Sequence, residues 1–421
     1  GEYQNLPVFE PGLAQIVKDV RGKNLFFSID VQNSIKIADL IFISVNTPIK
    51  SHGIGAGEAS DLKWVESSAR EISMYAEGHT IVVEKSTLPV KTARIIKSIL
   101  ESSNQNLGGD LGKTFSVLSN PEFLAEGTAV NDLENPDRVL IGGEDKTSID
   151  LLKEIYLRWV KSDKIITTNL WSSELSKLIA NAFLAQRISS INTVSAICES
   201  TGANVEEVAL AVGKDSRIGE KFLKSGPGFG GSCFKKDILN LVYICKSLGL
   251  KEVAAYWNEI IKINDWQQDR IYRTLVEKLY GNISGKRIVI LGFSFKANTN
   301  DTRNSPAITI CRKLLAEDAQ LVIHDPKVGE KDVFDALVGS ENIINFEKRL
   351  IYEINIPKAT ENADAVLIMT EWEDYINLDW KKLQIKMRKP SWIFDTRSII
   401  SPEQLKRIDL NFWQLGNGES Y

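Results

Sequence analysis

The chain has 421 residues, and its 51 Lys and Arg against 55 Asp and Glu give a formal net charge of −4. This near balance argues against a dedicated nucleic-acid or membrane-surface protein, because such proteins carry a basic excess or stripe. With 43% hydrophobic and 25% charged residues, the composition is that of a folded globular protein and excludes the disordered, collagen-like and coiled-coil classes. At roughly 100–200 residues per domain, the length predicts two or three domains.

The first 170 residues alternate between short apolar runs and amphipathic stretches. We expect strands at 39–45, 80–83, 115–118, 139–141 and 164–166, with helices at 62–76 and 90–100. Continuous rather than alternating apolar runs are typical of strands buried on both faces of a parallel sheet. Residues 1–170 are therefore predicted to form a doubly wound, Rossmann-like domain.

The pattern then becomes helical from about residue 171 to 283. A segment beginning at Val253 and continuing through Leu275 predicts one helix of more than about 25 residues, which suits a connector or a dimer interface. Strands return at 285–292, 320–325, 364–370 and 392–395. The predicted fold is thus α/β, with Rossmann-like domains at 1–170 and 284–421 joined by a helical dimerisation domain at 171–283.

Polar clusters follow three strands of the first domain, at Asn46-Thr47, Ser86-Thr87 and Asn120-Pro121-Glu122. Ligands of open α/β sheets bind beyond the carboxyl ends of the strands, so these clusters are expected to meet at one binding edge. The alternative is that these residues are ordinary turn formers.

The glycine-rich run Gly226–Gly231 precedes Ser232, which is expected to cap a helix with Cys233 in its first turn. Helix amide groups and the dipole there favour the nucleophilic thiolate. Asp237, four residues on, is expected on the same helical face. The alternative is a glycine turn before a buried cysteine. The other cysteines, Cys198, Cys245 and Cys311, lie in apolar patterns and are interpreted as core residues.

Two further pairs have a spacing of four residues. Lys177 and Asn181 lie on a mostly apolar helix, where a paired lysine could stabilise an oxyanion, and the alternative is a solvated lysine. Glu122 and Glu126 suit water activation, and the alternative is a surface helical turn.

A dinucleotide fingerprint is absent from both α/β regions. The run Gly53–Gly57 lacks the last glycine of the motif and does not end a strand, so it is interpreted as a loop. In the second region, Lys296 and Arg303 could hold phosphates instead, and surface charge is the alternative.

Several longer segments, in order along the chain, carry a family resemblance. They are Ser-Val-Asn-Thr-Pro48, Glu-Lys-Ser-Thr87, Asn-Pro-Glu-Phe-Leu-Ala-Glu-Gly127, Trp-Ser-Ser-Glu-Leu-Ser-Lys177, Gly-Phe-Gly-Gly-Ser-Cys-Phe234 and Asp-Thr-Arg303. With them the chain resembles the UDP-glucose 6-dehydrogenases of the nucleotide-sugar dehydrogenase family. The resemblance implies a two-step, four-electron oxidation of UDP-glucose to UDP-glucuronate with NAD as the cofactor.

The resemblance also implies roles for individual residues. Cys233 would form the thiohemiacetal and thioester, Lys177 and Asn181 would stabilise the oxyanion, Asp237 would transfer protons with Lys177, and Glu122 with Thr87 would help water hydrolyse the thioester. The implied NAD contacts are Val45, Asn46, Thr47, Pro48, Ile49, Ser86, Thr87, Glu126, Lys236 and Arg303. The implied substrate contacts are Glu122, Phe123, Leu124, Ala125, Glu126, Lys177, Asn181, Arg217, Lys224, Phe229, Gly230, Phe295, Lys296 and Arg397.

Arg217 would reach a neighbouring subunit, so the resemblance implies a homo-oligomer with a dimer as its minimal unit and a hexamer as its expected assembly. We expect no metal, no nucleic acid and no membrane partner. Few cysteines and no C-x-x-C pair predict free thiols and a cytoplasmic location.

Two departures from the family pattern lead to further expectations. The family's first strand and glycine-rich turn would precede Gly1, so we expect an incomplete NAD domain, and a protein that begins at Gly1 is expected to bind UDP-glucose with little NADH production. Thr396 replaces the usual glycine before Arg397, which puts the placing of Arg397 in doubt. GDP-mannose or a UDP-N-acetylhexosamine remains an alternative substrate, and an inactive UDP-sugar-binding form remains an alternative function.

Overall fold

The computed structural model describes residues 6, 8–105, 112–338, 349–405 and 407–418. The chain divides into two compact units, one of Gly1–Ala182 with Lys236–Trp257 and the other of Phe183–Lys235 with Asn258–Tyr421. Both chain ends of the predicted domains, Gly1 and Tyr421, lie outside the described residues. In the part of the chain that is described, no helix is both long and apolar enough to cross a membrane.

The first unit contains a five-stranded sheet with the order β1-β2-β3-β4-β5. Its strands are β1 (Leu40–Ile43), β2 (His79–Glu84), β3 (Thr114–Ser119), β4 (Val139–Gly142) and β5 (Ile165–Thr168). The parallel pairing predicted from the apolar runs is confirmed for β1 to β3 and for β4 with β5. The sheet is nevertheless mixed, because β4 runs antiparallel to β3 and meets it only at Ser119 and Gly142.

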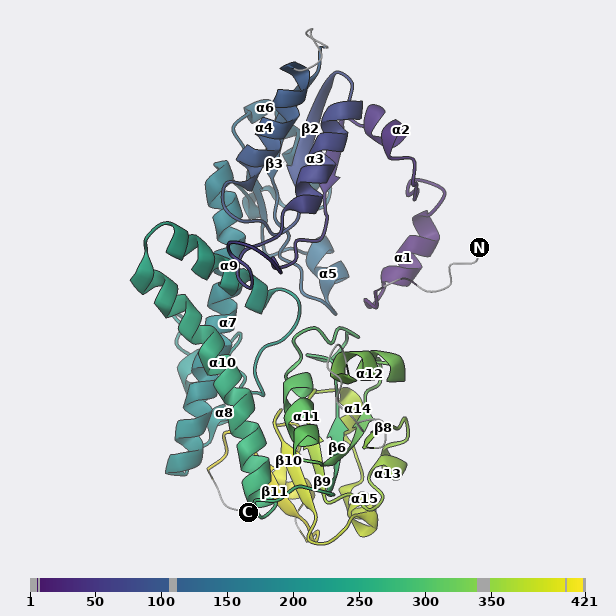
Figure 1. Ribbon diagram of the computed structural model, residues 1–421, viewed down its shortest axis with the longest axis vertical. Coiled ribbons are helices and arrows are strands. Elements are labelled where there is room, and N and C mark those ends of the chain that lie inside the picture. Colours follow the sequence, from purple (N-terminus) through teal and green to yellow (C-terminus); the bar gives the residue numbers. More distant parts are fainter. Residues whose placement is uncertain (1–5, 7, 106–111, 339–348, 406, 419–421) are drawn as a thin grey trace. The chain divides into compact units, whose positions relative to one another are not determined.

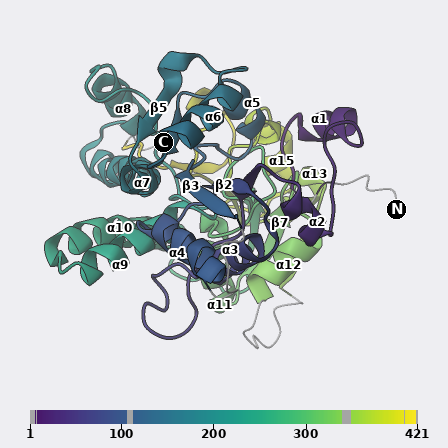
Figure 2. The same cartoon turned by 90° about the horizontal axis from the view of Figure 1, so that it is seen from above.

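Helices cover both faces of this sheet, as a doubly wound fold requires. Val82 and Val117 face a core shared with α3 (Lys63–Tyr75) and α4 (Thr92–Gln105). Their neighbours Ile81 and Leu118 face the opposite core, which includes Leu152 of α6 (Lys146–Tyr156). Alternate residues point to opposite faces of a strand, so the two cores use successive positions. Helices α3 and α4 lie side by side against β2 and β3 (Figures 1 and 2). The unit also contains the short helices α1 (Leu13–Val20), α2 (Val31–Lys36) and α5 (Ala129–Glu134) and the 3-10 turn Ser162–Lys164.

The second unit contains a six-stranded, fully parallel sheet with the order β11-β10-β9-β6-β7-β8. Its strands are β6 (Arg287–Leu291), β7 (Gln320–His324), β8 (Leu350–Tyr352), β9 (Ala365–Ile368), β10 (Trp392–Asp395) and β11 (Asn411–Gln414). This is the order of a complete dinucleotide-binding fold, whose ligands lie where the strand order reverses, here between β6 and β9. The sequence predicted four of these strands, and the short β8 and β11 were missed.

Helices also cover both faces of the second sheet. One core joins Ile290 to Ile310 and Leu314 of α11 (Pro306–Ala316), and the other joins Val289 to Tyr375 and Trp380. The smaller helices of this unit are α12 (Glu330–Val338), α13 (Ile356–Ala359), α14 (Glu373–Ile376), α15 (Trp380–Leu383), the 3-10 turn Gln384–Lys386 and α16 (Pro402–Leu405).

Four helices, two of them long, form the middle of the chain. They are α7 (Leu170–Thr201), α8 (Val205–Gly213), α9 (Phe234–Ser247) and α10 (Lys251–Lys278). The long helix predicted around Val253–Leu275 is confirmed as α10, with 28 residues. Helix α7, with 32 residues, is longer still.

A turn at Gly292 takes the place of a glycine-rich loop after β6. Gly292 has φ +95°, and a Cβ there would lie 2.7 Å from the backbone nitrogen of Thr370. Gly292→Ala is therefore expected to lower the free energy of unfolding by about 3 kcal/mol, from backbone strain plus overpacking. Gly281→Ala is the matched control, because Gly281 has φ +71° but open space around it and should lose only about 1–2 kcal/mol. Chemical denaturation measures both variants, and equal losses would contradict the packing argument.

Candidate active site

The edge of the first sheet brings several predicted cofactor residues together. Ser86 Oγ donates to the Val45 carbonyl at 2.7 Å, and Thr47 Oγ1 donates to the Thr87 carbonyl at 3.1 Å. Lys236 Nζ donates to Thr47 Oγ1 at 3.1 Å. The polar residues after β1 and β2 thus lie together at the carboxyl edge of the sheet, where open α/β sheets bind their ligands, and Lys236 lies beside them. Asn46, Pro48 and Ile49 follow in the same loop.

The Gly53–Gly57 run is a folded loop, as the sequence predicted. Lys50 N donates to the Ala59 carbonyl at 2.8 Å, and Gly57 N donates to the Lys50 carbonyl at 2.8 Å. A Cβ on Gly55 would meet Ala59 at 2.7 Å and the ring of Tyr243 at 2.8 Å. Glycine at position 55 allows this close packing, and the backbone N–H of Gly57 already donates a hydrogen bond within the loop.

Glu122 and Glu126 do not share a helical face. Residues 120–125 form a loop without regular secondary structure after β3, so the interpretation of the four-residue spacing as a helical turn is wrong. Pro121 disfavours a helical backbone at Asn120, whose side-chain Nδ2 donates to the Leu140 carbonyl at 2.7 Å. Phe123, Leu124 and Ala125 lie on this loop, and Glu126 enters the turn that ends it.

Lys177 is buried and has a partner, contrary to the alternative of a solvated lysine. Its residue is 4% exposed, and its Nζ lies 3.5 Å from Glu122 Oε2 and 5.3 Å from the centre of the Phe123 ring. Arg138 lies 3.8 Å from the same ring centre. Helix α7 therefore holds a cation at the loop that carries Glu122, which meets the cost of burying charge.

Asn181 and Asp237 form a second buried contact in this unit. Asn181 Nδ2 donates to Asp237 Oδ2 at 2.6 Å, and Asp237 is 1% exposed. Burial raises the pKa of Asp237, and the nearby Lys236 and the Asn181 hydrogen bond oppose that rise. A carboxyl group with a raised pKa can exchange a proton nearer neutral pH, which suits an acid or base.

Cys233 directly precedes helix α9, which begins at Phe234 rather than at the cysteine. Cys233 was expected in the first turn of this helix, after a cap at Ser232. In the structure the helix begins one residue later, so Cys233 lies just before the first turn. Ser232 Oγ lies 3.4 Å from Cys233 Sγ, and Cys233 is partly exposed. Cys198, Cys245 and Cys311 are buried, as predicted, and burial raises the pKa of each thiol.

Buried amides of two long helices hold the glycine loop in the second unit. Asn192 Oδ1 accepts from Gly226 N at 2.9 Å, and Gln267 Nε2 donates to the Gly226 carbonyl at 2.8 Å. Asn264 Oδ1 accepts from Phe229 N at 2.7 Å. The sequence analysis missed these three amides, although polar side chains on otherwise apolar helical faces were a usable signal.

The loop also packs against the second sheet's edge. Gly231 N donates to the Arg303 carbonyl at 2.8 Å, and a Cβ on Gly230 would lie 2.8 Å from Phe295 Cβ. Lys296 Nζ stands 5.6 Å from the centre of the Phe295 ring. The structure therefore brings Phe229, Gly230, Phe295, Lys296 and Arg303 to one region of this unit.

Backbone carbonyl groups hold the Arg397 side chain. Its Nε donates to the Met369 carbonyl at 2.8 Å, and its NH2 group donates to the Phe295 carbonyl at 3.0 Å. Thr396 does not have a positive φ, and its Oγ1 donates to the Ile368 carbonyl at 2.6 Å. The left-handed residue of this turn is Ser398, with φ +50°, so the expected need for glycine at 396 was wrong.

Two predicted substrate residues lie apart from these clusters. The Arg217 side chain is 87% exposed and pairs with Asp215, and Lys224 is exposed. Asp325, at the end of β7, accepts from Phe293 N at 2.7 Å and from Trp372 Nε1 at 3.2 Å. The acidic residue that contacts a ribose in dinucleotide-binding folds is thus engaged within this domain.

A carboxyl pair lies buried where β2 meets α7. Glu84 and Glu174 are 2% and 3% exposed, and Glu174 accepts backbone N–H bonds from Lys91 and Ala93 at 2.6 and 2.8 Å. Burial raises the pKa of both carboxyl groups, and the charge of Glu174 raises that of Glu84 further. The raised pKa values favour a proton shared by the two carboxyl groups.

This pair predicts a pH-dependent effect of Glu84→Gln. A carboxyl group with a raised pKa stabilises the fold below its unfolded pKa and loses that contribution as pH rises through the folded pKa. Gln keeps a donor without titrating, so the variant should gain stability relative to wild type between pH 5 and 8, by up to about 1.4 kcal/mol per pH unit. Thermal unfolding across this range measures the difference, with Glu77→Gln at an exposed Lys36 ion pair as the control. A difference that does not change with pH would refute the shared proton.

Comparison with known proteins gives the class of this protein, a nicotinamide-dependent dehydrogenase of nucleotide sugars. Models of the UDP-glucose/GDP-mannose dehydrogenase family match in three parts, the NAD binding domain at 2–160, the central domain at 171–266 and the UDP binding domain at 289–402. The chain belongs to the UDP-glucose/GDP-mannose dehydrogenase family.

Individual relatives agree with this assignment. UDP-glucose 6-dehydrogenase 3 of Oryza sativa subsp. japonica is 50% identical over 428 residues, covering 98% of this chain and 88% of the relative. UDP-glucose 6-dehydrogenase of Drosophila melanogaster is 52% identical over 418 residues, covering 98% and 87%. The structure of a UDP-glucose dehydrogenase from Pyrobaculum islandicum matches with a TM-score of 0.81 at 28% identity, covering 98% of this chain and 88% of that one.

Proposed function

We propose that the protein oxidises the 6-hydroxymethyl group of UDP-glucose to a carboxylate, with two NAD⁺ as hydride acceptors. The proposal rests on the relatives: proteins that are about half identical to this chain over nearly its whole length are named UDP-glucose 6-dehydrogenases. NAD⁺ supplies the hydride acceptor, and the Thr47, Ser86, Thr87 and Lys236 cluster fits its place at the carboxyl edge of the first sheet.

Cys233 is proposed as the nucleophile. Loss of one hydride and one proton converts the alcohol to an aldehyde, and the thiol adds to this aldehyde as a thiohemiacetal. Loss of a second hydride and a proton gives a thioester, which water hydrolyses to the carboxylate and the free thiol. The Cys233 position ahead of α9 and its partial exposure support this role.

Lys177 and Asn181 are proposed to stabilise the negative oxygen that forms at C6. Their polar groups are buried and held by Glu122 and Asp237, so they need little reorganisation. Asp237 is proposed to exchange the proton, because burial raises its pKa. Glu122 with Thr87 is proposed to orient the water that opens the thioester.

The second sheet and the glycine loop are proposed to hold the UDP portion. Phe229, Gly230, Phe295, Lys296 and Arg397 are the proposed contacts in this unit, together with the exposed Lys224. We also propose that Glu126 and Arg303 contact NAD and that Phe123, Leu124 and Ala125 line the sugar site. Arg217 is proposed to serve a neighbouring subunit of a homo-oligomer, and its exposure supports that use.

Three parts of the chain, 1–170, 171–283 and 284–421, are proposed to serve NAD binding, oligomer contact and UDP-sugar binding. A cytoplasmic location is also proposed, and the absence of disulfides among the four described cysteines supports it.

Parallel assays of nucleotide sugars test the substrate. NADH formation is followed with NAD⁺ and UDP-glucose, a UDP-N-acetylhexosamine or GDP-mannose, and the acid product is identified by mass spectrometry. We expect two NADH per UDP-glucuronate and the highest kcat/KM with UDP-glucose. Equal or better turnover of another donor would overturn the choice of substrate.

A further inference from the structure

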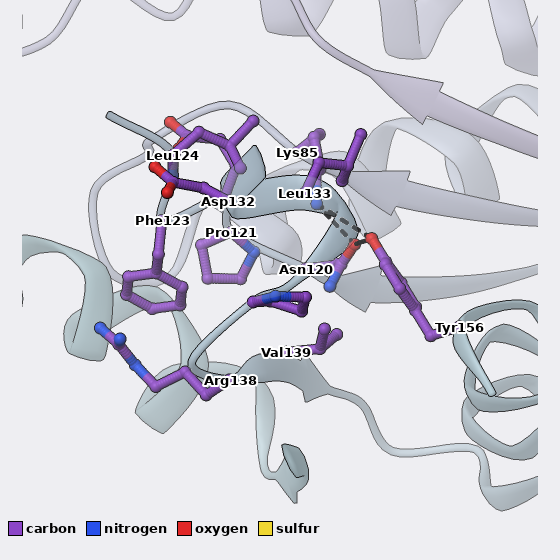
Figure 3. Close-up of a pocket in the computed structure, with 12 residues that line it drawn as sticks. Lys85, Asn120, Pro121, Phe123, Leu124, Asp132, Leu133, Arg138, Val139 and Tyr156 are labelled. Atoms are coloured by element: carbon purple, nitrogen blue, oxygen red, sulfur yellow. Dashed lines mark hydrogen bonds between the residues drawn. The ribbon is translucent and has the colours of Figure 1, made fainter. Parts of the chain in front are cut away.

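Lys85 belongs to no role described so far, although it follows β2 directly. Its Nζ donates to Asn120 Oδ1 at 2.9 Å and to the Tyr156 hydroxyl at 3.1 Å. The Tyr156 hydroxyl donates to the same Asn120 oxygen at 2.6 Å. Figure 3 shows these three side chains converging at one end of a pocket, with dashed lines between them.

This pocket lies within the first unit and is walled on one side by the loop that carries Glu122. Its lining residues include Lys85, Asn120, Glu122, Phe123, Arg138 and Tyr156. Asn120 lies two residues before Glu122, and its Nδ2 is fixed to the Leu140 carbonyl at 2.7 Å. Three of these four hydrogen bonds meet at the Asn120 side-chain amide, and the fourth joins Lys85 to Tyr156, so the start of the Glu122 loop is anchored from the end of β2, from β4 and from α6.

The charges around Lys85 come from each element beside the pocket. Glu122 is on the loop, Lys177 on α7, Asp132 on α5 and Arg138 just before β4. Burial lowers the pKa of Lys85 to about 8, with Lys177 adding to this and Glu122 opposing it. The ammonium form therefore still predominates at pH 7.

We propose that Lys85 is a positioning residue for the oxidation: it fixes the Asn120–Glu122 segment and keeps a positive charge beside Glu122. This inference rests on the proposed function, in which Glu122 helps water open the Cys233 thioester. Loss of Lys85 then slows hydrolysis of the thioester and leaves binding of UDP-glucose nearly unchanged.

Lys85→Met tests this proposal at pH 7, beside Lys85→Gln, which keeps a hydrogen-bond donor without charge, and Lys85→Arg, which keeps the charge. Lys97→Met is the matched control, because Lys97 pairs with Glu144 on the surface of the same unit. The readouts are kcat, KM, the Kd of UDP-glucose, the thermal midpoint and the intact mass of the protein during turnover.

For the Met and Gln variants we expect a loss of kcat of about 10–100-fold, within the range of a misoriented catalytic group. Kd should change less than about threefold, and a covalent sugar adduct on Cys233 should accumulate. The kcat of Lys85→Arg should be at least about tenfold higher than that of Lys85→Met. The kcat of Lys97→Met should match that of wild type.

Two results would overturn the role of Lys85 without affecting the proposed function. One is a kcat within threefold of wild type in folded Lys85→Met or Lys85→Gln. The other is a loss of kcat without accumulation of the Cys233 adduct. If Lys85→Met does not fold, Lys85→Gln gives the same decision. A wild-type protein that oxidises none of the nucleotide sugars would instead overturn the proposed function, and this inference with it.

Discussion

Replacing Cys233 with serine is expected to abolish net formation of UDP-glucuronate. A hydroxyl group in place of the thiol cannot form the thiohemiacetal and thioester through which the second hydride leaves, so the four-electron oxidation stops. The expected loss is at least about 10³-fold in uronate formation, a modest figure beside the roughly 10⁶-fold cost of removing a protease nucleophile. Mass spectrometry of the product and the ratio of NADH to uronate measure it.

Cys245→Ser is the control for this substitution. Cys245 lies on α9, the helix that Cys233 precedes, but it is 5% exposed and packed in the core. We expect it to retain turnover with some loss of stability. Wild-type rates of acid formation in Cys233→Ser would remove this residue from the nucleophile role.

Replacing Lys177 with methionine is expected to lower kcat by about 10²–10³-fold, the usual cost of removing one preorganised group that stabilises an oxyanion. Methionine fills similar space, so the loss reports the charge rather than packing. Lys177 is 4% exposed and its Nζ lies 3.5 Å from Glu122 Oε2, so the substitution also removes this ion pair. Single-turnover measurement of the first NADH isolates this step from thioester hydrolysis.

Lys97→Met again supplies the comparison, because its ammonium group pairs at the surface with Glu144. A Lys177→Met protein whose first-step rate remains within tenfold of Lys97→Met would show that Lys177 serves the fold rather than the chemistry. Retained binding of UDP-glucose would exclude a general collapse of the site.

Much of the fold could be predicted because buried parallel strands have a strong sequence signal. Val82, Val117 and their neighbours form continuous apolar runs, and each run became a strand with helices on both faces. The edge strands β8 and β11 were not predicted, because a strand of three or four residues is too short to show a clear apolar pattern. The antiparallel pairing of β3 with β4 at Ser119 and Gly142 was not predicted, because an apolar run does not indicate the direction of a strand relative to its neighbour.

The sequence by itself determined the α/β class, the long helix α10, the polar strand ends and the residue types that suit the chemistry. Only the tertiary structure showed that Glu122 lies on a loop rather than a helix, that Lys177 is its buried partner, and that residue 396 has no positive φ. It also showed that Lys85, Asn120 and Tyr156, which come from three different segments, share one set of hydrogen bonds. The physical reason is range: helix and strand periods act over a few residues, whereas these contacts join residues 35 to 71 positions apart in the chain.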